Sequence, residues 1–189
     1  MGDGSSPRLT PDLVIRRASP RDLAFAIEIL EEAAAWVAAG GQDGWVPGTF
    51  RDETGTGCTV LREALDAGEL FLARMDARAV GTVTLQGEDA VYWPEAVERV
   101  DARYVHRLAV RRGARGLGIG RFLLRWSEEE TASEGRPFVR LDCPAGSLFH
   151  NEYYRAAGYE HRGDVTVGEF RASLFEKRVG SGRHGNPNT

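Results

Sequence analysis

The sequence predicts a mixed α/β fold in which helices cover both faces of a mostly antiparallel sheet of six to seven strands. Two observations predict it. β-Prone runs joined by a short turn in the middle of the chain favour an antiparallel hairpin, and strand-like and helix-like segments alternate further on. Apolar residues at helical spacing over 23–37 and again from about 117 supply amphipathic helices to cover the sheet.

The first half begins with a β-prone run, followed by Ser19-Pro-Arg-Asp22, which offers an N-cap, a proline at the first helical position and an acid. Glycines at 40, 41 and 68 are expected to end two helices. The expected elements are a strand at 13–16, a helix at 23–37, a loop at 42–57, a helix at 60–67, and hairpin strands at 70–75 and 79–86. The acidic pair Glu31-Glu32 is expected on a solvated helix face.

The second half has an alternating run after a loop at 87–100, and Gly135-Arg-Pro137 breaks the helix that follows. Its expected elements are a strand at 102–110, a helix from about 117, a strand at 138–143, a helix at 147–157, and strands near 159–162 and 170–179. One domain over 12–179 accounts for all of them, with disordered ends at 1–11 and 180–189.

Composition excludes several classes. The 189 residues carry a net charge of −4, which argues against nucleic acid as a partner. No apolar run approaches the ~20 residues of a membrane helix, and residues 1–10 lack the apolar core of a signal peptide, so no membrane partner and a cytoplasmic location are expected. Cys58 and Cys143 offer no metal-ligand spacing and are expected to be reduced, packed thiols; no metal is expected.

The most informative segment runs from Val105 to Leu124 and predicts a strand, a basic glycine-containing turn and a helix start. Gly116, Gly118 and Gly120 let the backbone approach a bulky anion, and Arg115 adds a planar donor. Free N–H groups and the helix dipole at such a turn favour phosphate. A tight turn without a ligand is the competing interpretation.

A dinucleotide-binding interpretation fails on spacing. The pattern G-x-G-x-x-G needs glycine at a position that holds Arg121 or Leu123, although Asp142 lies at a suitable distance for a ribose contact. The loop also follows a hairpin rather than opening a parallel sheet near the N-terminus.

Arg115-x-x-Gly118-x-Gly120 after a strand, with Asn151-Glu-Tyr-Tyr-Arg-Ala-Ala-Gly-Tyr159 further on, resembles the GNAT family of N-acetyltransferases over nearly the whole chain. The resemblance implies acetyl-CoA as cofactor and Tyr154 as the acid that protonates the CoA thiolate. It also implies that backbone groups at Leu108 to Val110 pair with the pantetheine arm and polarise the thioester. The cofactor-binding residues it implies are Leu108, Ala109, Val110, Arg115, Gly116, Leu117, Gly118, Ile119, Gly120, Ser147 and Asn151.

His106 stands where many relatives carry a glutamate base. Strand periodicity places Tyr104, His106, Leu108 and Val110 on one face, and an imidazole with a pKa of ~6.5 could take the amine proton through water. A half-buried histidine bonded within the sheet is an equally good interpretation.

One departure from the family concerns an asparagine beside the pantetheine. Ser147 falls near that register, with Asn151 one helical turn on. Gln42-Asp-Gly-Trp45 resembles a substrate-side segment of related enzymes, and Trp93 precedes the central strand, so both tryptophans are candidates for the acceptor pocket.

The predicted function is acetyl transfer from acetyl-CoA to a primary amine of a small molecule or peptide, by direct attack in a ternary complex. A homodimer is common in the family. The alternatives are a non-catalytic acyl-CoA-binding module on the same fold, a nucleotide-dependent oxidoreductase, and a route through Cys143 as an acyl-carrying nucleophile.

Overall fold

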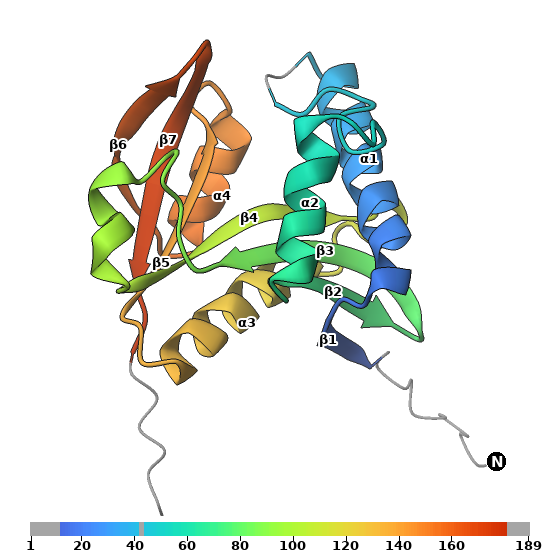
Figure 1. Ribbon diagram of the computed structural model, residues 1–189, viewed down its shortest axis with the longest axis horizontal. Coiled ribbons are helices and arrows are strands. Elements are labelled where there is room, and N and C mark those ends of the chain that lie inside the picture. The colour runs from blue at the N-terminus through green and yellow to red at the C-terminus, as the bar shows by residue number, and fades with distance from the viewer. Residues whose placement is uncertain (1–11, 42–43, 181–189) are drawn as a thin grey trace, which may run out of the picture.

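The computed structural model describes residues 12–41 and 44–180, except for the side chains of 97–99. Their seven strands form one sheet in the order β1-β2-β3-β4-β5-β7-β6, in which β4 and β5 are parallel and every other neighbouring pair is antiparallel (Figure 1). The strands are β1 (Leu13–Arg17), β2 (Leu70–Met75), β3 (Arg78–Gln86), β4 (Ala102–Val110), β5 (Phe138–Pro144), β6 (Glu160–Val167) and β7 (Phe170–Arg178). The predicted fold class is confirmed. The terminal segments predicted to be disordered, residue 180 apart, lie outside the described residues.

Helices cover both faces of the sheet. The helices are α1 (Leu23–Ala39), α2 (Thr56–Asp66), α3 (Ile119–Ser133) and α4 (Leu148–Ala156), with 3-10 turns at Pro20–Asp22, Pro94–Arg99 and Arg112–Ala114. Ile29 of α1 and Leu61 of α2 belong to one buried cluster, and Leu123 of α3 and Tyr154 of α4 belong to another. Among the described residues, no helix has the length and apolarity needed to cross a membrane.

Several boundaries differ from the sequence prediction. Ser19 caps the 3-10 turn that leads into α1, through its hydroxyl and N–H, which donate to the Asp22 carboxylate at 2.7 and 2.8 Å. The helix α2 begins at Thr56, before the predicted start at residue 60, because extended Gly55 serves as its N-cap. The strand β6 continues to Val167, because β7 pairs with it along its whole length.

The strands β4 and β5 pair over a short stretch and then separate. Their pairing runs from Ala102–Phe138 to Val105–Leu141, and no pairing between them follows in the described chain. Beyond that point, the backbone groups of β4 that face β5 lack a strand partner. This separation opens the sheet in the middle of the molecule.

A bulge in β4 overturns one prediction about its faces. Thr84 pairs with His106 but Thr82 pairs with Ala109, so two residues of β4 oppose one of β3, and Arg107 is left-handed with φ +51°. Strict alternation therefore fails after His106. Leu108 packs with the α3 cluster, whereas Ala109 belongs to the α1–α2 cluster. The prediction that Tyr104, His106, Leu108 and Val110 share one face is wrong.

Glu31 is buried rather than solvated, contrary to the expectation for the acidic pair. Its carboxylate accepts the N–H of Gly48 at 2.7 Å and the N–H of Phe50 at 2.8 Å. These bonds tie the segment after α1 to the helix. The same segment carries Trp45, whose ring meets the Phe50 ring edge to face, so Glu31 positions one wall of the site described next.

Candidate active site

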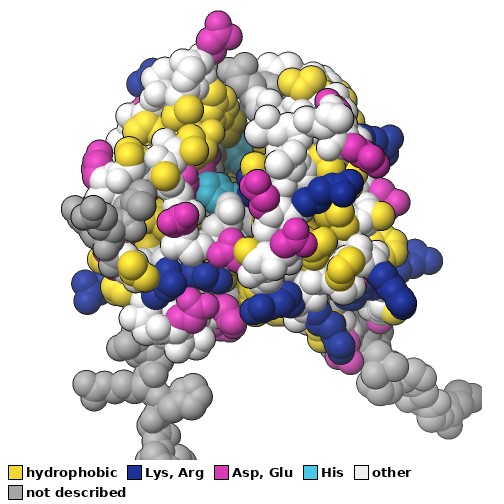
Figure 2. Space-filling model, in the orientation of Figure 1, with side chains coloured by type: hydrophobic (Ala, Val, Ile, Leu, Met, Phe, Trp, Pro, Cys, Tyr) yellow, Lys and Arg dark blue, Asp and Glu magenta, His cyan; other side chains and the backbone are white. Residues whose placement is uncertain are grey.

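A cavity of about 720 Å³ lies where β4 and β5 separate. Residues of α1, β4, β5 and α4 line it, together with the glycine-containing turn before α3. Figure 2 shows the hollow from one side, with histidine side chains inside it between hydrophobic ones. The structure therefore brings the glycine turn, the strand after the bulge and the tyrosine-bearing helix to one place.

The glycine turn has the backbone of an anion-binding loop. Gly116 and Gly118 have φ of +79° and +78°, and an added Cβ at either would meet nothing within 4 Å. These glycines are thus required by backbone conformation and leave open space for a ligand. Gly118 directly precedes the first residue of α3, and Gly118, Ile119 and Gly120 line the cavity, so this helix start with its free N–H groups lies at the cavity wall.

Three other residues of the turn differ from these two glycines in their surroundings: Gly120, Leu117 and Arg115. At Gly120 a Cβ would lie 2.7 Å from the Tyr153 hydroxyl, so a larger residue there would displace the side chain of Tyr153. Leu117 is exposed and does not line the cavity, although its backbone belongs to the turn. The Arg115 guanidinium lies 3.9 Å above the Trp36 ring, which holds it at the cavity edge by a cation–π contact.

Tyr154 lies on the buried side of α4 and lines the cavity. Burial raises the pKa of its phenol strongly, and the nearby Cys143 and Asp142 add to the effect. The hydroxyl is therefore protonated at neutral pH, as a proton donor must be. Tyr153 lines the same cavity, with the Arg121 guanidinium 4.8 Å from its ring centre.

Cys143 also lines the cavity, but its surroundings oppose ionisation. Burial and then the Asp142 charge raise the pKa of its thiol to about 12. A thiol needs to be a thiolate to attack a thioester. This environment disfavours a route in which Cys143 is an acyl-carrying nucleophile.

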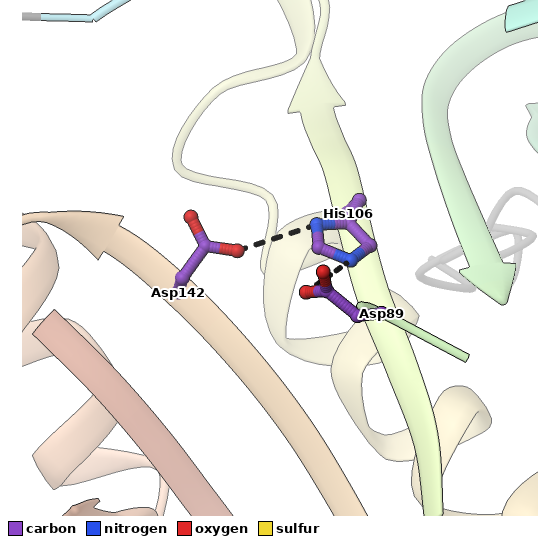
Figure 3. A group of neighbouring side chains, drawn as sticks. All are labelled: Asp89, His106 and Asp142. Atoms are coloured by element: carbon purple, nitrogen blue, oxygen red, sulfur yellow. Dashed lines mark ion pairs between the residues drawn. The ribbon is translucent and has the colours of Figure 1, made fainter. Parts of the chain in front are cut away.

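His106 is held between two carboxylates, as Figure 3 shows. Its Nε2 lies 3.2 Å from Asp89 Oδ2, and its Nδ1 lies 3.3 Å from Asp142 Oδ1. Asp89 is buried in the loop before β4, where its other oxygen accepts the N–H of Val91 and of Tyr92. Both ring nitrogens face acceptors, and an imidazole donates from both only when it is protonated.

The pKa of His106 differs from that of an ordinary histidine. Burial alone lowers the pKa of His106, but the carboxylates of Asp142 and Asp89 outweigh it and raise the pKa to about 9. Burial raises the pKa of Asp89, but the imidazole of His106 and the N–H groups of Tyr92 and Val91 outweigh it, so that the pKa is lowered. His106 thus holds its proton at neutral pH, and its pKa lies above the ~6.5 assumed from the sequence.

The same three side chains also have the donor types of a metal site, with ligand atoms within 4.8 Å of one another. The two nitrogens of His106 face different carboxylates, however, rather than converging with both on one point. The arrangement fits a half-buried imidazole that is held between two aspartates.

Ser147 and Asn151, which are predicted to contact the cofactor, make hydrogen bonds within and before α4. The Ser147 hydroxyl lies 2.7 Å from His150 Nδ1 and caps α4, and Asn151 Nδ2 donates to the Ser147 carbonyl at 2.9 Å. Neither residue lines the cavity. Trp45 does line it, as predicted, but Trp93 does not: its ring packs near Tyr104 and the Arg140 guanidinium.

Several cavity residues were not predicted from the sequence. Arg107 and Tyr92 line the cavity from a bulge and a loop without a motif, and Trp36 lines it from α1. Asp89, which contacts His106 from the loop before β4, was not predicted either. The sequence offers Asp142 only as a residue for a ribose contact and does not predict its contact with His106. The bulge could not be inferred, because Arg107 is not a residue type that favours positive φ.

A glycine turn before a helix start, a stretch of β4 that does not pair with β5 and a buried tyrosine meet in one cavity, an arrangement that suits an acyl-CoA-dependent transferase. The model of the acetyltransferase (GNAT) domain matches residues 66–161, half of the sequence, so the chain belongs to the GNAT family. It is a GNAT-type N-acetyltransferase, and acetyl-CoA is the cofactor of this class.

Individual relatives agree with this membership. The chain is 28% identical over 155 residues to the uncharacterized N-acetyltransferase YesJ of Bacillus subtilis, covering 80% of this chain and 82% of YesJ. A GNAT acetyltransferase structure from Listeria monocytogenes matches with a TM-score of 0.70 at 21% identity, covering 90% of this chain and 99% of that one. The PaiA N-acetyltransferase of Thermoplasma acidophilum, solved with coenzyme A, matches with a TM-score of 0.69 at 19% identity, covering 89% and 99%. At these identities the two structures establish the fold.

Proposed function

We propose that this protein transfers an acetyl group from acetyl-CoA to a primary amine of a small molecule or peptide, by direct attack in a ternary complex. The observation that carries the proposal is one cavity that is lined by the glycine turn, by Tyr154 and by His106 with Asp142. Two substrates bound side by side there would gain the rate advantage of proximity without an acyl-enzyme.

The turn from Arg115 to Gly120 would bind the pyrophosphate of the cofactor. Backbone N–H groups and Arg115 supply the donors, as helix starts do for phosphates. The backbone of Leu108 to Val110 would hold the pantetheine arm and polarise the thioester carbonyl, because β4 lacks a strand partner towards β5 from residue 106 onward. Leu108, Ala109 and Val110 line the same cavity.

Tyr154 would protonate the departing CoA thiolate. A phenol with a raised pKa stays protonated until the leaving group needs the proton. No residue of the protein becomes acylated in this scheme.

His106 is the proposed base, acting directly or through water on the incoming ammonium. With a pKa of about 9 it holds a proton at neutral pH, so the fraction able to accept one rises with pH. The pKa of a primary ammonium is ~10, so a base with a pKa near 9 is better matched to it than an ordinary imidazole.

Substitution of Tyr154 by Phe separates the enzyme from the non-catalytic module. We expect kcat for thiol release to fall about 10²-fold, with unchanged CoA affinity, because general acid help is worth ~10²–10⁴. Tyr159→Phe is the matched control: that buried ring contacts Tyr154 from outside the cavity. Equal turnover by both variants removes Tyr154 from the mechanism, and no turnover by the unmodified protein with any amine favours the module. A homodimer, expected from the family, is tested by the mass of the protein in solution.

A further inference from the structure

Arg107 occupies a conformation that only its surroundings can maintain. It is a non-glycine residue at φ +51°, in the bulge of β4, a conformation that costs of the order of 1 kcal/mol. Its Nη1 donates to Thr84 Oγ1 at 3.2 Å and to Gln86 Oε1 at 3.1 Å, both on β3. These bonds hold a half-buried guanidinium at the wall of the cavity.

The guanidinium of Arg107 lacks the carboxylate partner that most half-buried or buried arginines of the described residues have. Among the described residues, no carboxylate oxygen lies within 4.0 Å of it. The half-buried or buried arginines that do have such a carboxylate are Arg74, Arg103, Arg111, Arg136 and Arg140. Arg121 is the other exception, and its Nη1 donates to the carbonyl of Ala156. Removing a cation from water without an opposite charge beside it costs folding free energy. The two bonds that Arg107 Nη1 donates go to neutral oxygens, and an uncharged donor could make them equally well.

The charges around it do not supply that anion. Asp142 and Asp89 are near enough to favour its charged form, but both are engaged by His106. The carboxylate of Glu63 on α2 is exposed and favours the charged form of Arg107 less strongly. Burial outweighs all of these and lowers the pKa of Arg107. The cavity is thus lined by the pair His106–Asp142 and, separate from it, by a guanidinium with unused donors.

We propose that Arg107 binds a carboxylate of the acceptor, so that the acceptor is an amino acid or a similar small molecule with an amine and a carboxylate. The amine would lie towards His106, the proposed base, and the carboxylate would take the planar donors of Arg107, which match its geometry. Tyr92 and Phe170, whose rings meet at 6.4 Å in the same wall, would contact the substituent between them. This inference rests on the proposed function and names its acceptor class.

The test is calorimetric binding of matched acceptors to the CoA complex. The probes are the L-amino acids, their carboxamides and their decarboxylated amines. The best-bound amino acid is expected to exceed its carboxamide and its amine by about 10- to 100-fold, the worth of a charged hydrogen-bonded pair. Arg107→Gln is expected to remove this ratio without changing CoA affinity, and Arg107→Lys to keep part of it.

Arg78→Gln, on the exposed β2–β3 hairpin, is the control and keeps the ratio. The inference is overturned if carboxamides or amines bind as well as the acids, if no acid binds, or if Arg107→Gln weakens CoA. Selective acid binding without any acetyl transfer would instead overturn the proposed function alone. The comparison of ligands on the unmodified protein stands even where a variant does not fold.

Discussion

His106 and Asp142 lie with Nδ1 and Oδ1 3.3 Å apart, across the point where β4 and β5 separate. The pair joins the two strands at the level where backbone pairing has ended. It also fixes the charge of the imidazole, which Asp89 reinforces from the opposite side. The same contact therefore has a structural and a chemical consequence.

The chemical consequence is an alkaline pH dependence. With a peptide acceptor whose amine pKa is ~8, kcat/KM should continue to rise to about pH 9, because His106 loses its proton there. His106→Gln should lower the rate above pH 8 by at least about tenfold and remove that part of the profile. A pH–rate profile checks it. If kcat/KM stops rising at pH 8, or if its pH dependence is the same in His106→Gln, His106 is not the base.

The structural consequence concerns stability. The pKa of His106 is raised on folding, so its contribution to stability is complete below about pH 6.5 and is lost as pH rises through about 9. Urea unfolding at pH 6, 7.5 and 9.5 should show a decline of about 1–3 kcal/mol relative to His106→Gln over this range. A parallel pH dependence of the two proteins would show that the ion pairs do not stabilise the fold.

Gly118→Ala separates backbone strain from ligand binding. The substitution places a Cβ at φ +78°, which should cost about 1 kcal/mol of stability, and the new methyl group would stand in the open space of the turn. CoA affinity should fall at least about tenfold. Gly135→Ala is a close control, because its φ is +76° and its surroundings are equally open at the end of α3.

Both glycine variants should lose similar stability by urea unfolding, and calorimetry should show weaker CoA binding for Gly118→Ala alone. If the two bind CoA equally, the turn before α3 is not the pyrophosphate site.

Glu31→Ala should loosen the wall that carries Trp45. The buried carboxylate accepts two backbone N–H groups, which would be left without partners, at a cost of about 2–4 kcal/mol. The acceptor KM should rise while CoA affinity stays constant. Glu28→Ala, an exposed position on the same helix, is the control, and equal effects of the two changes would show that the segment does not shape the acceptor site.

The residues show what the sequence could predict and what it could not. The glycine turn and Tyr154 were predictable, because positive-φ glycines before a helix and an aromatic signature at its spacing are local patterns. The arrangement around His106 was not, since Asp89 and Asp142 come from separate parts of the chain and carry no motif. Periodicity failed at Arg107, because a bulge adds one residue to a strand without a compositional signal.

Acetyl transfer itself is measured most directly by mass spectrometry of amines incubated with the protein and acetyl-CoA, with free thiol counted in the same samples. The proposed function predicts an N-acetylated amine formed in equal amount to free CoA, and no acetylated protein. Binding of acetyl-CoA without an acetylated amine, or acetyl carried on Cys143, would contradict it.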